Sequence, residues 1–266
     1  MSNKVIDFHT HIFPDDLAAR GVESLYESYR LYPHTDGTAS GLLDSMDKAH
    51  ISYSVTQPVA TKPSQVSTIN NLAAANNNGR LIYFGAIRAD CVSPEQEIEN
   101  AISLGLKGIK IQGNWQGFAV DDPRLYTAYE YASGRLVFMY HAGTEIAPID
   151  VGYASSARIA NVKKLFPKLD VVAAHMGGFR RWDESWRSLV GTKVYLDTSS
   201  SLGLGLETEE FLRMIRVHGT DRVLFATDSP ILDQTKQLEA IKCSGLTDTE
   251  LEKILWTNGA DLLGLR

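Results

Sequence analysis

Two histidines one residue apart form the chain's clearest chemical pattern. The mostly apolar run VIDF at residues 5–8 is typical of a short buried strand, and His9 and His11 come at its end. In an extended backbone, side chains two positions apart point to the same face, so these two imidazoles are expected to converge. Imidazole nitrogens are preferred ligands of divalent metals such as zinc. The sequence therefore predicts a metal centre to which other segments add ligands.

Three further polar residues stand in equivalent positions. His141, His175 and Asp228 each follow an apolar run by one or two residues. A catalytic zinc site combines imidazole nitrogens with carboxylate oxygens and leaves a position for water, whose pKa the metal lowers to about 7. A carboxylate beside the metal binds it or accepts the proton of this water, and another histidine can carry a proton or polarise a substrate. This residue set therefore suits hydrolytic chemistry.

The elements that must position these residues alternate along the chain. Eight short apolar runs are predicted as strands: 5–8, 53–57, 81–87, 108–112, 136–140, 170–174, 194–197 and 223–226. Helices are predicted at 39–49, 64–77, 94–104, 123–133, 156–166, 183–190 and 208–218, followed by shorter ones at 234–241, 248–255 and 258–263. Eight strand-helix units favour a closed (β/α)8 TIM barrel, an α/β fold in a single domain over 1–266. Active sites of such barrels lie at the carboxyl ends of the strands.

The pattern also predicts one helix start and one irregular segment. Ser93, Pro94 and Gln96 have the spacing of a capping box at the start of a helix. The segment 12–38, which carries several aromatic residues, is expected to be irregular, either a lid over the site or a packed loop.

Bulk composition excludes several classes of protein. The chain has 266 residues and a net charge of −6, which argues against a broad nucleic-acid or anionic-membrane surface. Cys91 and Cys243 are expected to be reduced and mostly buried. No signal peptide and no apolar run of bilayer-spanning length is found, so a cytoplasmic protein is expected.

Four motifs in order carry a family resemblance. They are IDFHTHIFP at 6–14, HMGG at 175–178, TDSP at 227–230 and ILWTNGADLLGL at 254–265. Together they resemble the amidohydrolase superfamily, and in particular its amidohydrolase-related branch, which contains aminocarboxymuconate-semialdehyde decarboxylase and many metal-dependent hydrolases. The resemblance covers essentially the whole chain.

The resemblance implies specific roles. His9, His11, His141 and Asp228 would be metal ligands, with Asp228 also accepting a proton, and His175 would be catalytic. It further implies one divalent metal ion per chain, a small-molecule substrate and a homodimer. A site of several histidines and one carboxylate suits Zn²⁺, with Mn²⁺ as the alternative.

Other residues are candidates for substrate contacts. Lys110 lies inside the predicted strand 108–112 and is interpreted as a substrate-binding charge, or as a carbamylated bridge between two metals. Glu145 and Arg180 follow the segments of His141 and His175 and are also candidates. Asp7 and Asp197 are interpreted as supporting or structural. Substrate choice would depend on the loops 12–38 and 143–156.

Four functions remain open at this stage. The first is hydrolysis of an amide, lactone or related carbonyl compound by a metal-activated water. The alternative is non-oxidative decarboxylation of an unsaturated or aromatic acid, which would use the same ligands. A TatD-like nuclease is disfavoured because Lys110-Ile111-Gln112 stands where a metal-binding glutamate is expected. A non-catalytic binding protein is disfavoured because all five polar site residues are present.

Overall fold

The computed structural model describes residues 4–77, 79–145 and 151–265, and its paired strands are parallel and follow chain order. One sheet contains β1-β2-β3 and the other contains β4 to β9 in sequence. The strands are β1 Ile6–Thr10, β2 Tyr53–Thr56, β3 Leu81–Tyr83, β4 Gly85–Ala86, β5 Gly108–Ile111, β6 Val137–Tyr140, β7 Asp170–Ala173, β8 Tyr195–Asp197 and β9 Val223–Leu224.

The two sheets form one ring of (β/α)8 type. Only Phe84 separates β3 from β4, so the predicted strand 81–87 is present as two short pieces joined by the chain itself. The opposite junction, between β9 and β1, has no regular ladder. It is bridged by single backbone hydrogen bonds, such as the one that Phe8 N–H donates to Phe225 O at 2.8 Å. The predicted TIM-barrel fold is therefore confirmed in its strand order.

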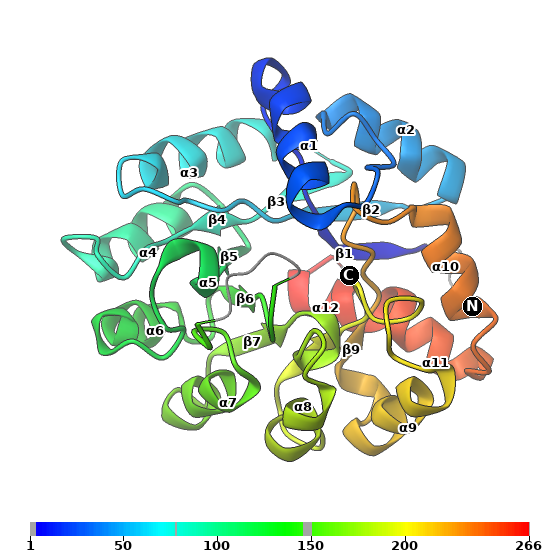
Figure 1. Cartoon of the computed structure of the whole chain (residues 1–266). Coiled ribbons are helices and arrows are strands. Elements are labelled where there is room, and N and C mark those ends of the chain that lie inside the picture. The colour runs from blue at the N-terminus through cyan, green and yellow to red at the C-terminus, as the bar shows by residue number, and fades with distance from the viewer. Residues whose placement is uncertain (1–3, 78, 146–150, 266) are drawn as a thin grey trace.

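Helices surround the ring of strands (Figure 1). The predicted helices 39–49, 208–218 and 258–263 match at both ends, and most of the others match within a residue or two. The α-helices are α1 Asp15–Tyr29, α2 Ala39–Ala49, α3 Gln65–Asn76, α4 Pro94–Ser103, α5 Gly113–Gln116, α6 Tyr126–Ala132, α7 Ser156–Leu165, α8 Trp182–Ser188, α9 Thr208–His218, α10 Gln234–Lys242, α11 Asp248–Glu252 and α12 Asn258–Leu263. Short 3-10 helices cover Pro123–Leu125, His175–Gly177 and Thr220–Arg222, and a π-helical turn covers Lys253–Thr257.

Helix α1 corrects the expectation of an irregular segment over 12–38. Fifteen of these residues form a regular helix. Its acidic first turn, Asp15 and Asp16, suits the positive end of the helix dipole. Four of its apolar residues that are buried or partly buried recur at intervals of four, three and four, a helical period: Ala18, Val22, Leu25 and Tyr29.

The predicted capping box is also wrong. The Ser93 side chain makes no capping hydrogen bond, and its backbone carbonyl accepts from Gln96 N–H at 3.1 Å instead. Pro94 does occupy the first turn of α4 as expected. A reciprocal capping box is found at the start of α11, between Thr247 and Glu250.

Most of the core lies in two parts because strand residues alternate between faces. In β6, Val137 and Met139 pack inside the barrel, whereas Phe138 and Tyr140 pack between the strands and the helices. His141 continues the inward series directly after β6. The same alternation brings Asp228 to the mouth after the inward residues Leu224 and Ala226.

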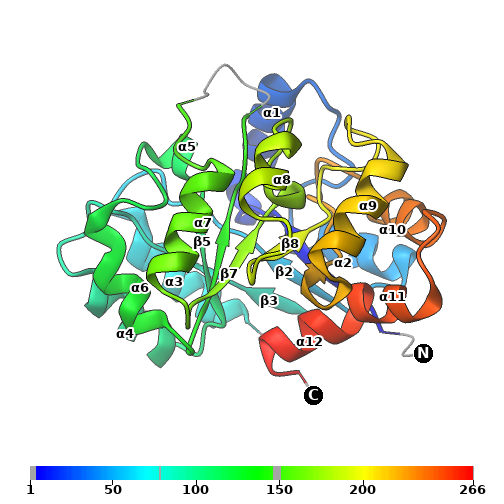
Figure 2. The same cartoon turned by 90° about the horizontal axis from the view of Figure 1, so that it is seen from below.

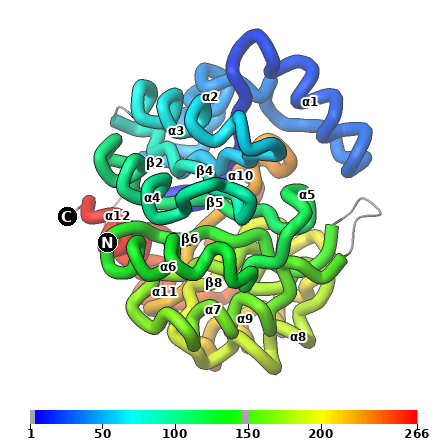
Figure 3. Tube along the Cα trace, turned by 90° about the vertical axis from the view of Figure 1, so that its left-hand side faces the viewer, coloured from blue at the N-terminus to red at the C-terminus, as the bar shows by residue number. Residues whose placement is uncertain are grey.

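Helix α12 covers the amino ends of the strands. Ala260 and Leu263 belong to the barrel's interior cluster, and a Cβ atom at Gly259 would lie 3.2 Å from the Ile6 side chain. Figures 2 and 3 place α12 at one end of the barrel and α1 with α5 at the opposite end. The carboxyl ends of the strands therefore open toward α1 and α5.

Two expectations drawn from bulk composition can be compared with the structure. Cys91 is half-buried, but Cys243 is exposed at the end of α10, so the expectation that both thiols are mostly buried is wrong for Cys243. Across residues 4–77, 79–145 and 151–265, no helix has both the length and the apolar character needed to cross a bilayer.

Candidate metal centre

His9 and His11 face the barrel interior because β1 is irregular. Phe8 packs inside the barrel, and regular alternation would next send Thr10 inward. The pairing of β1 with β2 shifts register between Asp7 and Thr10, as in a β-bulge, which re-aims side chains. His9 therefore points inward, and His11, two residues later, points to the same place.

His9, His11 and Asp228 form a compact triangle of potential ligand atoms. The two Nε2 atoms are 3.1 Å apart, and Asp228 Oδ1 lies 3.2 Å from His11 Nε2 and 3.6 Å from His9 Nε2. A tetrahedral metal with ligands at about 2.0–2.1 Å has corners about 3.3–3.4 Å apart. The three atoms are thus spaced like three corners of such a site, and these residues fit a divalent cation.

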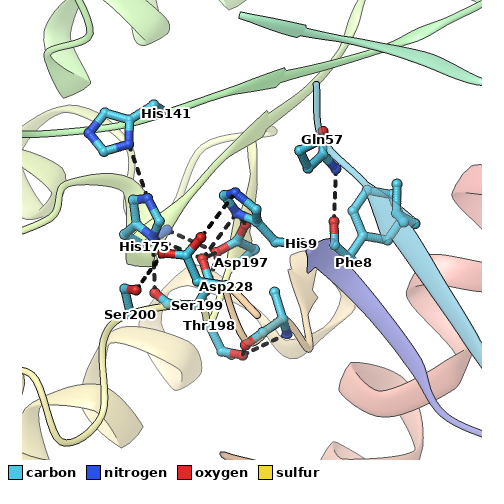
Figure 4. A network of polar contacts seen from close by, with 12 residues as sticks. Phe8, His9, Gln57, His141, His175, Asp197, Thr198, Ser199, Ser200 and Asp228 are labelled. Carbon is cyan, nitrogen blue, oxygen red and sulfur yellow. Dashed lines mark hydrogen bonds and ion pairs between the residues drawn. The ribbon is translucent and has the colours of Figure 1, made fainter. Parts of the chain in front are cut away.

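Both histidines are held in the tautomer that a metal requires. His9 Nδ1 lies 2.9 Å from Asp197 Oδ2, and His11 Nδ1 lies 2.8 Å from the carbonyl oxygen of Gln57. Both partners are acceptors, so each Nδ1 carries a proton and each Nε2 keeps an unprotonated lone pair, which in His9 faces Lys110 Nζ at 3.1 Å. The Gln57 side chain is itself fixed, since its Nε2 donates to Phe8 O at 3.0 Å (Figure 4).

Asp197 organises the residues behind the triangle. Its Oδ1 accepts from His175 N–H at 2.9 Å and from the Ser199 N–H and hydroxyl at 3.0 and 2.5 Å. Burial alone would raise the pKa of this carboxyl, but His9, His175 and Ser199 outweigh it and lower the pKa to about 2. Asp197 is therefore ionised, and the interpretation of this residue as a supporting group agrees with its contacts.

His175 enters the same cluster from the end of β7. Its backbone is in the left-handed region at φ 59°, and its ring stacks on that of His9 with centroids 5.3 Å apart. Its Nδ1 lies 2.8 Å from Ser199 Oγ and its Nε2 lies 3.1 Å from His141 Nδ1. The predicted catalytic histidine thus lies between the triangle and His141 (Figure 4).

His141 is not brought into the triangle. Its Nε2 lies 3.0 Å from Glu145 Oε1 and 3.0 Å from Thr144 O. Because both neighbours are acceptors, this nitrogen carries a proton, and it cannot bind a metal in this arrangement. The structure therefore joins His141 to the centre through His175, and the role of His141 as a ligand stays a prediction.

A glycine keeps these two histidines side by side. Gly143 has φ 95°, and a Cβ atom there would lie 2.3 Å from Phe179 N, so only glycine fits. Phe179 N–H donates to Ala142 O at 2.8 Å across the same contact. The chain after β6 and the chain after β7 can therefore run together.

Asp228 completes the triangle from the chain after β9. Its backbone is left-handed at φ 70°, and its Oδ2 accepts from the Ser200 hydroxyl at 2.6 Å. Burial opposes ionisation, but His9, His11 and His175 together hold the pKa of this carboxyl well below its usual range. Asp228 therefore presents one free, ionised oxygen to the site.

Burial also sets the charges of the basic groups. It lowers the pKa of His9 to about 4, with the charge of Lys110 acting in the same direction, and it lowers the pKa of His175 to about 3. Both rings are therefore neutral near pH 7, the state in which imidazole binds metal. Burial likewise lowers the pKa of Lys110 to about 8, and its Nζ lies 3.1 Å from His9 Nε2.

A cavity of about 1050 Å³ opens over these residues. Lys110 and Glu145, both predicted to contact substrate, line it. Arg180 does not: it is exposed, and its guanidinium lies over the Phe179 ring at 5.1 Å. Residues 146–150 of the predicted specificity loop lie outside the described residues. Much of the wall is apolar or aromatic, with Ile12, Phe13, Leu17, Leu25, Tyr29, Val59, Ile69, Leu72, Trp115, Phe179, Leu204 and Ile231.

Several residues of the site escaped the sequence analysis. Tyr29, at the end of α1, lines the cavity, where burial and the charge of Glu145 raise the pKa of its hydroxyl, and Arg20 of the same helix also lines the cavity. The apolar period of α1 was the available signal for Tyr29. Ser199 carried a weaker signal, its position two residues after an aspartate at a strand end.

Comparisons with known proteins agree with this architecture. A TIM-barrel protein of Bordetella bronchiseptica superposes with TM-score 0.78, 21% identity and 98% of each chain covered. The 2,6-dihydroxybenzoate decarboxylase of Rhizobium superposes with a TM-score of 0.73 at 16% identity. The match covers 98% of this chain and 99% of the decarboxylase. A protein of Pseudomonas putida assigned as a 2-pyrone-4,6-dicarboxylic acid hydrolase superposes with a TM-score of 0.67 at 14% identity. The match covers 100% of this chain and 99% of that protein. At these identities the likeness shows the fold alone. Comparison with curated proteins gives no match.

The family comparison goes further than the fold. The model of the family described as Amidohydrolase matches residues 6–265, nearly the whole chain. The matched region contains every residue of the triangle, together with His141, His175 and Lys110. The chain is therefore an enzyme of the amidohydrolase family.

Proposed function

We propose that this enzyme hydrolyses a carbon–nitrogen or carbon–oxygen bond of a small carbonyl compound, with one divalent cation held by His9, His11 and Asp228. One observation carries this proposal: three ligand atoms spaced 3.1–3.6 Å apart face a cavity large enough for a substrate. A cation bound there would supply a nucleophilic water at neutral pH.

The residues around the triangle support distinct roles. Asp228 Oδ1 is the proposed proton acceptor, because its other oxygen is occupied by the Ser200 hydroxyl at 2.6 Å. His175 is the second proposed catalytic group, since it is neutral and buried beside His9. His141 is proposed as a further ligand. For this role, its Nδ1 must give up the contact with His175 Nε2 and bind the cation instead.

Two charged residues are proposed to contact substrate. Lys110 is suited to an anionic substrate group, because it is the buried cation beside His9. Glu145 lies at the cavity wall and accepts from Asn114 Nδ2 at 3.2 Å. The exposed position of Arg180 gives no support to its predicted role.

Metal analysis of the purified protein is the first test. About one zinc per chain, or one manganese, would agree with the proposal, and Asp228→Ala should lower this value. Two metals per chain would instead favour a carbamylated Lys110 as a bridge. No metal, even after metal is added back, would overturn the assignment of ligands.

Decarboxylation is a second candidate, and the cavity wall favours it. Phe13, Tyr29, Trp115 and Phe179 line the cavity, and aromatic side chains suit a planar ring by stacking. The same three ligands could hold a cation in either reaction. Sequence and site geometry are therefore compatible with both.

Isotope labelling separates the two reactions. Metal-loaded enzyme is incubated with panels of lactones, amides, esters and hydroxybenzoates, first in H₂¹⁸O and then in D₂O. A hydrolase transfers ¹⁸O to its product, whereas a decarboxylase releases carbon dioxide and places deuterium on carbon. Turnover with ¹⁸O transfer alone would exclude the decarboxylase, and carbon–deuterium bond formation would exclude the hydrolase.

Some broader expectations belong to the same proposal. We propose that the chain is a single domain over 1–266, that it forms a homodimer and that it acts in the cytoplasm. Its net charge of −6 supports a small molecule rather than a nucleic acid as its substrate. Sedimentation of the purified protein tests the dimer directly.

A further inference from the structure

The cavity over the metal centre continues far beyond it, between helices α1 and α3. Its volume of about 1050 Å³ slightly exceeds the range of about 300–1000 Å³ that is typical for drug-sized ligands. A small lactone or hydroxybenzoate would leave much of it empty. Figure 1 shows α1 reaching from the outer edge of the ring toward its centre, beside α3.

Helix α1 forms one wall along its whole length. Tyr29, at its carboxyl end, lines the cavity together with Glu145 and the residues of the metal centre. Leu17, near its amino end, also lines the cavity and lies about 18 Å away along the helix axis, at about 1.5 Å per residue. The residues between them that face the cavity recur every three or four positions and are Arg20, Gly21, Ser24, Leu25 and Ser28.

Helix α3 and the turn before it form the opposite wall. Gln65, Thr68, Ile69 and Leu72 share one helix face and all line the cavity. Leu72 is 47% exposed and Leu17 is 41% exposed, so each leaves apolar surface uncovered. We call the space between these helices, lined by Leu17, Ser24, Leu25, Gln65, Thr68, Ile69 and Leu72, the outer groove.

The composition of the outer groove selects its ligand. Its walls are leucine and isoleucine side chains with uncharged hydroxyl and amide groups between them. The charged residues of this part, Asp16 and Arg20, stand near the amino end of α1. Such a lining gives no cluster of cations for a polyanion, and it offers continuous apolar contact.

We propose that the outer groove binds an unbranched apolar chain of the substrate, whose carbonyl group lies at the metal centre. The substrate is thus an elongated acyl or alkyl compound rather than a compact ring. The continuity of the outer groove with the metal cavity supports this occupant over a separate partner. This inference rests on the proposed function for the reacting end of the substrate only.

Chain-length dependence of binding tests the inference without requiring turnover. Zinc-loaded full-length protein is titrated by calorimetry with straight-chain carboxylates from butanoate to dodecanoate, below the concentrations at which they form micelles. Each added methylene should tighten binding by up to about fourfold, until the outer groove is filled. A flat series would overturn the proposal.

Matched leucine variants locate the effect. Leu72→Asp should abolish the gain with chain length and leave butanoate binding unchanged, and Leu17→Asp provides a second variant on the other wall. Leu165→Asp is the control, because Leu165 lies on α7 and is 46% exposed, about as much as Leu72. Equal chain-length dependence in the Leu72 and Leu165 variants would refute the outer groove as the binding site.

Two further outcomes are informative. If Leu72→Asp converts a dimer into a monomer while the chain-length series is unchanged, the outer groove is a subunit interface and the proposal is wrong. Alternatively, no compound of any panel is hydrolysed, but binding tightens with chain length and Leu72→Asp abolishes this gain. This result would support the outer groove as a binding site and refute the proposed hydrolysis. The two hypotheses therefore fail separately.

Discussion

Replacing Asp197 by asparagine should weaken metal binding without touching a ligand of the triangle. Asp197 Oδ1 faces three donors, the N–H groups of His175 and Ser199 and the Ser199 hydroxyl, at 2.9, 3.0 and 2.5 Å. Its Oδ2 faces one, His9 Nδ1, at 2.9 Å. In the variant, the amide oxygen must take the position with three donors, because an NH₂ group there would leave them all unpaired.

This orientation reverses the tautomer of His9. Three unpaired buried donors would cost about 1–3 kcal/mol each, so the amide NH₂ is forced toward His9 Nδ1. That nitrogen must then accept, and the imidazole proton moves to Nε2, the atom in the triangle with His11 and Asp228. A metal must displace this tautomer before it binds. Loss of a partner that orients a ligand typically costs about 10–100-fold in metal affinity, or about 1.4–2.8 kcal/mol.

Competition against a chromophoric chelator measures the effect. The zinc dissociation constant of Asp197→Asn is compared with that of the unmodified protein, after a urea unfolding curve has shown that the variant is folded. We expect a 10–100-fold increase. An increase below about twofold would show that Asp197 does not set the tautomer of His9.

Two variants serve as controls for this measurement. Ser199→Ala removes one of the three donors to Oδ1 and leaves the contact between Oδ2 and His9 in place, so its effect should be about fivefold or less, one hydrogen bond being worth about 1 kcal/mol. Asp183→Asn removes the same charge from an exposed ion pair with Arg187 and should leave zinc affinity unchanged. A large loss in Asp183→Asn would point to long-range charge instead of tautomer control.

Further predictions follow from residues away from the triangle. Burial lowers the pKa of His218 in the folded protein. As pH falls, the His218 side chain is therefore protonated in the unfolded chain before it is protonated in the folded one. The free energy of unfolding should then decrease below about pH 6.5, by at most about 1.4 kcal/mol per pH unit. Urea curves at several pH values should show a smaller fall for His218→Gln, and an identical fall would exclude His218 as a source. Burial raises the pKa of the Cys91 thiol to about 11, so a thiol reagent at pH 8 should modify the exposed Cys243 at least tenfold faster, as mass spectrometry of the labelled peptides would show.

The strands could be predicted because each is buried on both faces. Strands of a parallel barrel pack against the interior on one side and helices on the other, so they appear as nearly continuous apolar runs. In β6, all four residues are buried, and they alternate between the two parts of the core. The carboxyl ends of such strands share one edge, which is why residues as distant as His9 and Asp228 could be expected to meet.

The contacts of individual side chains could not be predicted in the same way. His141 stands at the expected strand end, but its Nε2 is engaged by Glu145, four residues later. Position along a strand determines where a side chain begins, whereas its hydrogen-bond partners determine which nitrogen it offers. Arg180 follows the same principle: the left-handed backbone there, at φ 56°, goes with an exposed side chain lying over Phe179.

Helix α1 shows how one missed element changes the view of function. The segment contains Gly21 and no side-chain N-cap, since Pro14 precedes the helix, so the usual start signals are weak. Gly21 has its own purpose: a Cβ atom there would lie 2.6 Å from the Phe13 ring, which packs against the helix at this point. Glycine lowers helix propensity, but here its lack of a Cβ atom lets the Phe13 ring, part of the cavity wall, pack closely against α1. The same helix contributes Tyr29 and Leu17, near its two ends, to the cavity wall. Helix α1, which the sequence analysis missed, therefore supplies much of the surface that is proposed to determine substrate specificity.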